Sequence, residues 1–259
     1  MAKSQLWGVS LIVNSRKEIY NTVNQQLTLV QPNALTIVTL NPEILLAAKE
    51  KPLYAEMLNK FNLKVIDGFG VKIAGIIKGF KTGDRVTGAD LAEFIFRESL
   101  KRKLKVGIVY REDGLSSYSD LKRFFTQRNV TLFAWNSVRK NGLENIEDFY
   151  SWKPEVLLVG LGVLSQEEFI LKTKGKLPNL RLAIGIGGVF DFWTGRKKRA
   201  PKWMQKIGLE WLGRLFLLPK GKNSFKMQRI RKIWRSTGFF LLERQPRSEE
   251  RRVGKECRS

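Results

Sequence analysis

The 259-residue chain contains no histidine and a single cysteine, Cys257. The absence of histidine argues against Ser–His–Asp hydrolases and removes the commonest metal ligand. A lone cysteine argues against disulfides within the chain, cysteine-based zinc sites and thiol catalysis. Any acid–base chemistry must therefore fall to carboxylates.

Long apolar runs are also missing. No segment reaches the roughly 18 uncharged apolar residues of a membrane-spanning helix. The apolar run near the N-terminus is too short for a secretory signal peptide. We therefore expect the protein to be made and kept in the cytoplasm.

The chain has an excess of positive charge, and most of this excess lies near the C-terminus. The chain has 47 Lys and Arg against 24 Asp and Glu, and residues 196–246 hold fifteen of the cations but only two glutamates. The last thirteen residues, 247–259, match the translation of a common sequencing adapter, so we expect them to be an assembly artefact. We predict an α/β core at residues 1–195 and a basic amphipathic appendage at residues 196–246, with a binding role for its charge.

Short apolar runs alternate with helical patterns through the first 190 residues. This alternation predicts an α/β fold with a mostly parallel, Rossmann-like sheet that is covered by helices on both faces. The predicted strands are residues 6–13, 34–39, 64–66, 104–110, 131–135, 156–160 and 182–187. The predicted helices are residues 15–29, 42–60, 69–78, 87–102, 116–128, 143–150 and 165–173.

Several polar or glycine residues fall at or just past the ends of predicted strands, namely Thr39, Asn41, Asp67 and residues 160–162. In open parallel sheets, ligands bind beyond the carboxyl ends of the strands. Asp67 follows two apolar residues and precedes Gly68, so a partly desolvated carboxylate there could act as a general base. The alternative interpretation is a turn or helix-capping aspartate, and capping is also the alternative for Thr39 and Asn41.

Residues 187–215 combine a glycine-rich strand end, an aromatic cluster, four consecutive cations and an amphipathic helix. The glycines allow close backbone approach to a ligand, and the cations at residues 196–199 supply charge for a phosphate-bearing partner. In the helix, apolar residues recur every four positions between flanking cations. These apolar residues are Trp203, Ile207, Trp211 and Leu215.

The pattern GGxFDFxxGxxxRAPxWMQxxGLEWLxRL at residues 187–215 resembles the C-terminal signature of the WecG/TagA/CpsF glycosyltransferase family. Three further matches precede it in order, which are TLNPE at residues 39–43, DGFGV at 67–71 and RVTGADL at 85–91. Together they span about residues 8–218. The resemblance implies an inverting transfer of an N-acetylmannosamine-type sugar from a UDP donor to an undecaprenyl-diphosphate-linked GlcNAc acceptor. Such transfers serve cell-surface polysaccharide or teichoic acid synthesis.

The resemblance also implies roles for individual residues. Asp67 is expected to be the general base, and Arg85 to bind the donor diphosphate and stabilise the leaving group, with a salt bridge to Asp84 or Asp90 as the alternative. We found no DxD pair for a divalent metal, so we expect a metal-independent enzyme without a cofactor. The expected substrate-binding residues are Thr39, Asn41, Gln166 and Arg214.

The chain departs from the family pattern in four places. One is a longer segment beyond Arg214, so the terminal arginines cannot be matched one by one. Leu164 and Ser165 replace the proline and lysine that precede Gln166, and Asp84 stands where the family usually has glutamate. Residues 110–114 replace a glycine-rich segment, which puts nucleotide contacts at that strand end in doubt. An inactive sugar-nucleotide-binding relative is therefore one alternative.

A basic nucleic-acid-binding protein is the other alternative, because the sequence pI is about 10.3 and aromatic residues lie among the cations. Against it, the cations flank an apolar helical stripe, which is the form expected at an anionic lipid surface. We therefore expect no nucleic-acid partner but a peripheral protein on the inner face of the bacterial cell membrane. A homo-oligomer is left open.

Overall fold

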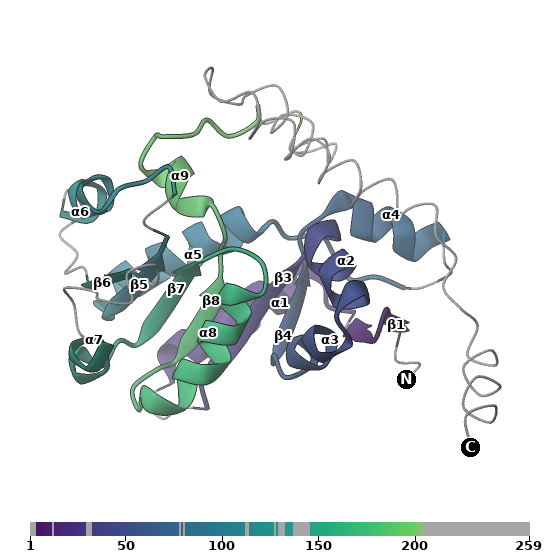
Figure 1. Cartoon of the computed structure of the whole chain (residues 1–259), viewed down its shortest axis with the longest axis horizontal. Helices are drawn as coiled ribbons and strands as arrows, with labels where there is room; N and C mark the ends of the chain where they lie inside the picture. Colours follow the sequence, from purple (N-terminus) through teal and green to yellow (C-terminus); the bar gives the residue numbers. More distant parts are fainter. Residues whose placement is uncertain are drawn as a thin grey trace.

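The computed structural model describes residues 4–11, 13–29, 33–77, 79, 81–111, 114–126, 128, 133–136, 146–201 and 204. These residues form an α/β fold around a six-stranded sheet with the order β4-β3-β8-β7-β5-β6, in which every neighbouring pair is parallel (Figure 1). The predicted fold class is confirmed. The strands are β3 (Leu35–Leu40), β4 (Leu63–Ile66), β5 (Val106–Tyr110), β6 (Phe133–Asn136), β7 (Val156–Gly160) and β8 (Leu182–Gly185).

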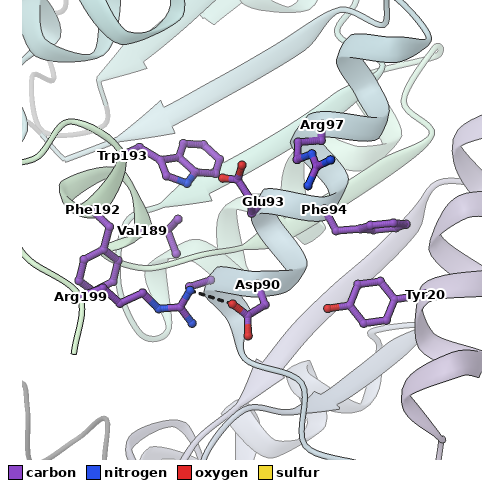
Figure 2. A pocket seen from close by; sticks show the side chains of 10 residues that line it. Tyr20, Asp90, Glu93, Phe94, Arg97, Val189, Phe192, Trp193 and Arg199 are labelled. Carbon is purple, nitrogen blue, oxygen red and sulfur yellow. Dashed lines mark hydrogen bonds and ion pairs between the residues drawn. The ribbon is translucent and has the colours of Figure 1, made fainter. Parts of the chain in front are cut away.

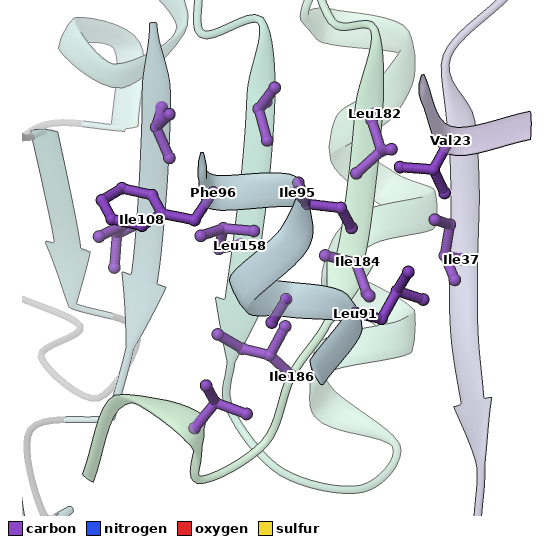
Figure 3. Packing of buried hydrophobic residues seen from close by; sticks show 14 of the residues in the cluster. Val23, Ile37, Leu91, Ile95, Phe96, Ile108, Leu158, Leu182, Ile184 and Ile186 are labelled. Atoms are coloured by element: carbon purple, nitrogen blue, oxygen red, sulfur yellow. The ribbon is translucent and has the colours of Figure 1, made fainter. Parts of the chain in front are cut away.

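Helices cover both faces of the sheet because side chains of successive strand residues point alternately to each face. One buried cluster joins the sheet to α1 (Arg16–Thr28), α5 (Gly88–Lys101) and α6 (Tyr118–Thr126). Figure 3 shows Leu91, Ile95 and Phe96 of α5 lying over the strands. The opposite cluster contains residues of α2 (Pro42–Glu50), α3 (Pro52–Asn59), α4 (Phe69–Ile77), α7 (Ile146–Trp152) and α8 (Ser165–Thr173).

Two of the helices that matter for the site begin at side-chain caps. The Asn41 side chain accepts a hydrogen bond from the Ile44 N–H, and Pro42 fills the first position of α2. The Thr87 hydroxyl accepts one from the Asp90 N–H at the start of α5. Both caps satisfy backbone donors that a helix start leaves without partners inside the helix. They fix where these helices begin relative to the preceding strand ends.

Two sequence-based assignments were wrong. Residues 6–13 do not form one strand of the main sheet, because β1 (Ser4–Leu6) and β2 (Val9–Leu11) form a separate antiparallel hairpin. The turn between them places Trp7 at φ 48° and Gly8 at φ 81°. The predicted helix at 42–60 is two helices, since Lys51 takes an extended conformation before Pro52.

A short helix that was not expected, α9 (Val189–Trp193), follows β8. No helix in the described part of the chain is long and apolar enough to cross a membrane. The predicted strand at 131–135 corresponds to β6 at Phe133–Asn136. Most of the predicted appendage, including its amphipathic helix and Arg214, lies outside the described residues, and so does the segment 247–259.

Candidate active site

The turns that follow β3 and β4 are bonded to each other at the carboxyl edge of the sheet. The Asp67 N–H donates to the Leu40 carbonyl at 2.9 Å, so the carboxylate-bearing turn is joined to the end of β3. Gly68 allows this contact, because a Cβ at that position would lie 2.6 Å from the Cδ of Pro42. The TLNPE and DGFGV motifs therefore meet in space, as the parallel sheet predicts.

The RVTGADL motif completes the same corner. The Nε of Arg85 donates to the backbone carbonyl of Asp67 at 3.0 Å. The Gly88 N–H, at the first position of α5, donates to the Asp67 carboxylate (Oδ1) at 3.1 Å. Donors at the start of a helix stabilise negative charge. Asp67, half-buried, is thus a carboxylate oriented by a fixed backbone donor and flanked by a guanidinium.

Thr39 and Asn41 lie beside this carboxylate turn, but each also has a structural task. Thr39 is buried, and a Cβ on Gly88 would lie 3.2 Å from its hydroxyl oxygen, so the start of α5 packs directly on β3. Asn41 caps α2 through a 3.0 Å hydrogen bond, as the alternative interpretation proposed. Their contacts with substrate remain predictions.

The two carboxylates proposed as alternative partners of Arg85 have other contacts. Asp84 accepts a hydrogen bond from the backbone N–H of Arg16 at 2.9 Å. Asp90 forms an ion pair with Arg199 at 2.7 Å. Arg85 itself is half-buried beside Asp67, to whose backbone carbonyl it is bonded. Its role in binding that diphosphate stays a prediction.

Gln166 belongs to a buried hydrogen-bond relay. Its Oε1 accepts a hydrogen bond from the Gly187 N–H at 3.1 Å, and its Nε2 donates to Glu167 at 2.7 Å. Glu167 also accepts hydrogen bonds from the Tyr54 hydroxyl at 2.9 Å and the Leu164 N–H at 2.7 Å. The Gln166 side chain therefore holds the glycine turn after β8 in place. A direct contact with substrate remains a prediction for this residue.

Glu167 is fully buried, which disfavours its charge. Burial raises the pKa of this carboxyl above its ordinary value of 4.5, while hydrogen bonds from Gln166, Tyr54 and Leu164 act in the opposite direction. At pH values between 4.5 and the raised pKa, Glu167 keeps its proton in the folded protein but has released it in the unfolded chain. The contribution of Glu167 to stability is thus fully present at lower pH and declines as pH rises through the raised pKa.

Replacing Glu167 with glutamine should destabilise the fold by about 1–3 kcal/mol, because an amide NH₂ then faces a buried donor. The pH dependence assigned to Glu167 should disappear with the carboxyl. Urea denaturation at several pH values measures both effects. Glu168→Gln is the matched control, since the neighbouring Glu168 is only half-buried and pairs with the exposed Lys172. Equal urea midpoints for the two variants at low and neutral pH would show that the relay contributes nothing.

The segment after β8 packs closely on the neighbouring strand end. A Cβ on Gly160, the last residue of β7, would lie 2.8 Å from the Phe190 ring and from the Gly187 carbonyl. Asp191 accepts a hydrogen bond from the Ser116 hydroxyl at 2.8 Å, which joins α9 to the segment after β5. The GGxFDF pattern therefore builds one wall of the carboxyl edge.

Arg196 and Arg199, which belong to the run of cations at residues 196–199, form ion pairs with carboxylates of the core. Arg196 donates through Nε and Nη2 to the two carboxylate oxygens of Asp120, at 2.9 and 2.7 Å. These hydrogen bonds hold the pKa of Asp120 well below its usual range. Arg199 pairs with Asp90 at 2.7 Å. The start of the predicted appendage is therefore bound to the core. Arg196 and Arg199 already form ion pairs with Asp120 and Asp90 in this structure.

A groove of about 410 Å³ runs beside α5, between α1 and α9 (Figure 2). Its walls combine aromatic rings with charged side chains of both signs. The Asp90–Arg199 ion pair lies at one end, and Arg97 lies a further two turns along α5. The groove is lined by Tyr20, Ala89, Asp90, Glu93, Phe94, Arg97, Val189, Phe192, Trp193 and Arg199.

Sequence reasoning missed three parts of this arrangement. The motif containing Gln166 was recognised, but its spacing gave no sign that Glu167 reaches Tyr54. The pairing of Arg199 with Asp90 joins two recognised motifs that are far apart in the chain. The pairing of Arg196 with Asp120 involves a residue outside all recognised motifs. No three potential metal ligands come together among the described residues, and metal independence stays a prediction.

Comparison with known proteins assigns this site to a family. The profile of the glycosyl transferase WecG/TagA/CpsF family matches residues 4–237. An N-acetylglucosaminyldiphosphoundecaprenol N-acetyl-beta-D-mannosaminyltransferase of Bacillus subtilis is 30% identical over 200 residues, which cover 71% of this chain and 72% of that protein. The protein of the same name from Bacillus spizizenii is 30% identical over 185 residues, with 71% of each chain covered. The chain belongs to the WecG/TagA/CpsF family of glycosyl transferases.

Proposed function

We propose that the protein transfers an N-acetylmannosamine-type sugar from UDP to an undecaprenyl-diphosphate-linked GlcNAc acceptor, in cell-surface polysaccharide or teichoic acid synthesis. The observation that carries the proposal is the Asp67 carboxylate. It lies at a parallel-strand end, with a helix N-terminal donor on one oxygen and Arg85 beside its backbone. The names of the two Bacillus relatives supply the sugar and the acceptor.

In the proposed reaction, Asp67 removes the proton from a hydroxyl of the acceptor sugar. The acceptor oxygen forms a bond to the anomeric carbon of the donor sugar, and the bond from that carbon to the diphosphate breaks. UDP leaves with the bonding electrons, and Arg85 stabilises the negative charge that develops on it. A beta-linked product, as in the relatives' names, implies inversion when the donor is alpha-linked to UDP.

Thr39 and Asn41 lie beside Asp67 and are proposed to orient the donor sugar. Gln166 supports the Gly187 turn after β8, which is the neighbour of β3 on the side away from β4 and Asp67. We propose that the donor contacts backbone groups of this turn. Arg214 is proposed to add a cation for the substrate diphosphates from the basic segment. Without a metal, these cations neutralise the leaving group.

We further propose that residues 196–246 dock the enzyme on the anionic inner face of the bacterial membrane, where a polyprenyl-linked acceptor resides. The high positive charge of this segment and its apolar helical pattern support this role. Binding to nucleic acid is not favoured, since the family is one of glycosyl transferases and the Bacillus relatives are named as sugar transferases.

The proposed function predicts that UDP is released from UDP-N-acetylmannosamine only when a prenyl-diphosphate-linked GlcNAc acceptor is present. We expect the same rate in EDTA, because cations of the protein take the place of a metal. The measurement is a coupled assay of UDP with the full chain, together with mass analysis of the lipid product. Absence of turnover with every acceptor would support an inactive relative, and loss in EDTA that Mn²⁺ or Mg²⁺ restores would reveal a missed carboxylate site.

A further inference from the structure

Arg199 holds two side chains at the start of α5, namely those of the cap Thr87 and of Asp90 in the first turn. Its Nη1 donates to the Asp90 carboxylate at 2.7 Å, and its Nη2 donates to the Thr87 hydroxyl at 3.1 Å. Figure 2 shows the Asp90 contact at the end of the groove. A guanidinium holds two partners at once because its donors are fixed in a planar fork. Arg199 therefore restrains the position of the helix start as well as its charge.

The same helix start supplies the donor to the catalytic carboxylate. Thr87 is the cap of α5 and accepts a hydrogen bond from the Asp90 N–H, at 3.1 Å. Gly88, which follows Thr87, donates its N–H to the Asp67 carboxylate at 3.1 Å. Arg199 thus donates hydrogen bonds to Thr87 and Asp90, the residues on either side of Gly88 and Ala89. A shift of this turn would move the Gly88 donor relative to Asp67.

An arginine is an unexpected neighbour for a helix N-terminus, where positive charge is unfavourable. Its presence is balanced by Asp90. Partial burial opposes ionisation of this carboxyl, but hydrogen bonds from Arg199 and Thr87 outweigh burial and lower its pKa. The side chain of Arg199 is 26% exposed to solvent and that of Asp90 is 42% exposed. Exposed ion pairs contribute little to stability, so a strictly structural role would be weak.

We propose that Arg199 is a positioning residue for the proposed general base, acting through the Thr87–Asp90 turn and the Gly88 N–H on Asp67. The expected effect on catalysis rests on the proposed function, whereas the hydrogen bonds that link Arg199 to Gly88 do not depend on it. Other charged groups near this corner are Arg85, whose Nε bonds the Asp67 carbonyl, and Arg16, whose Nη2 bonds the Arg85 carbonyl at 3.2 Å. The charge of Arg16 also helps to lower the pKa of Asp90. The two hydrogen bonds of Arg85 and Arg16 named above, however, do not join the α5 turn that Arg199 holds.

The test compares Arg199→Gln with Arg181→Gln in the full chain. Arg181 is a matched control, because it also bridges a carboxylate (Glu155, 2.7 Å) and a second acceptor (the Leu27 carbonyl, 2.9 Å), but at the amino edge of the sheet. With detergent-solubilised acceptor, we expect Arg199→Gln to lower kcat by about 10–10²-fold, the scale of a small misplacement of catalytic groups. The donor KM should change much less than kcat.

The pH profile separates positioning from a general loss of structure. Weakening the Gly88 donor makes the ionised carboxylate less favourable, so the acidic limb of the profile should move to higher pH in Arg199→Gln. Arg199→Lys keeps a charge for Asp90 but loses the fork, and should give an intermediate kcat. Arg181→Gln should keep the wild-type limb. Equal effects of the two glutamine variants, or an unmoved acidic limb, would overturn the proposal.

Hydrogen exchange gives a readout that needs no turnover. We expect the Gly88 amide to exchange faster in Arg199→Gln than in the wild type, and unchanged in Arg181→Gln. If the wild type releases no UDP but the Gly88 amide still exchanges faster in Arg199→Gln, the proposed function is wrong and the restraint of the α5 turn by Arg199 is supported. If Gly88 exchange does not respond, the positioning inference fails whatever the activity.

Discussion

Replacing Asp67 with asparagine is expected to lower kcat by about 10²–10⁴-fold, the usual cost of losing a general base. The amide is nearly isosteric and its oxygen can still accept the Gly88 N–H, so the turn between β4 and α4 should keep its shape. Binding of the UDP-sugar should therefore survive. Single-turnover kinetics measure the chemical step, and calorimetry with the donor measures binding.

Asp148→Asn is the control for this change. Asp148 is an exposed carboxylate on α7, which leads into the amino end of β7 and so lies away from the carboxyl edge. This control should retain wild-type kcat. Near wild-type turnover in Asp67→Asn would remove Asp67 from the mechanism, whereas loss of donor binding in that variant would indicate a role in the ground state.

Neutralising five cations of the basic segment should weaken binding to anionic vesicles by about 10³-fold or more at low salt. Each Lys or Arg near an anionic leaflet contributes about 1 kcal/mol, and five together contribute about 5 kcal/mol. Binding of the unmodified chain should weaken with added salt and be absent on phosphatidylcholine alone. Co-sedimentation with phosphatidylglycerol vesicles measures the effect. The five cations, all to be changed to glutamine, are Lys226, Arg229, Arg231, Lys232 and Arg235.

The control removes five positive charges from exposed positions of the core. It tests whether a lower net charge, wherever it is removed, is enough to weaken binding. It should bind the vesicles much more tightly than the first variant. Equal weakening in both variants would mean that the basic segment is not the docking element. Duplex DNA that outcompetes the vesicles at physiological salt would instead favour the nucleic-acid hypothesis. The five core residues, likewise changed to glutamine, are Lys17, Lys60, Lys122, Lys172 and Lys176.

Much of the fold could be predicted because local patterns agree with the final packing. The strand at Val156–Gly160 was predicted with both ends correct, since its short apolar run begins after Glu155 and ends in a glycine. The hairpin at the N-terminus was not, because its alternating apolar residues continue through the turn. Only Gly8 marks that turn in the sequence, and its partner Trp7 adopts a conformation that the residue type does not favour.

The site was predictable to the extent that strand ends carry its residues. Thr39, Asn41 and Asp67 converge because parallel strands bring their carboxyl ends together. The contacts that orient them could not be found in this way, since they join elements with no local relation in sequence. The sequence predicts that Arg199 supplies charge to a phosphate-bearing partner, and only the fold shows that Asp90 and Thr87 accept its hydrogen bonds.

The pairing of β3 with β8 has a consequence for synthesis of the chain. All six residues of β3 are buried, and one edge of this strand bonds to β8 through Leu35 and Leu182. During translation, that edge stays open until residues 182–185 emerge, long after β4 is available for the other edge. Open apolar strand edges are prone to mispairing, and such distant parallel pairing forms slowly. The last described strand to be made therefore closes the centre of the sheet, and we expect the nascent protein to be most prone to mispairing just before that moment.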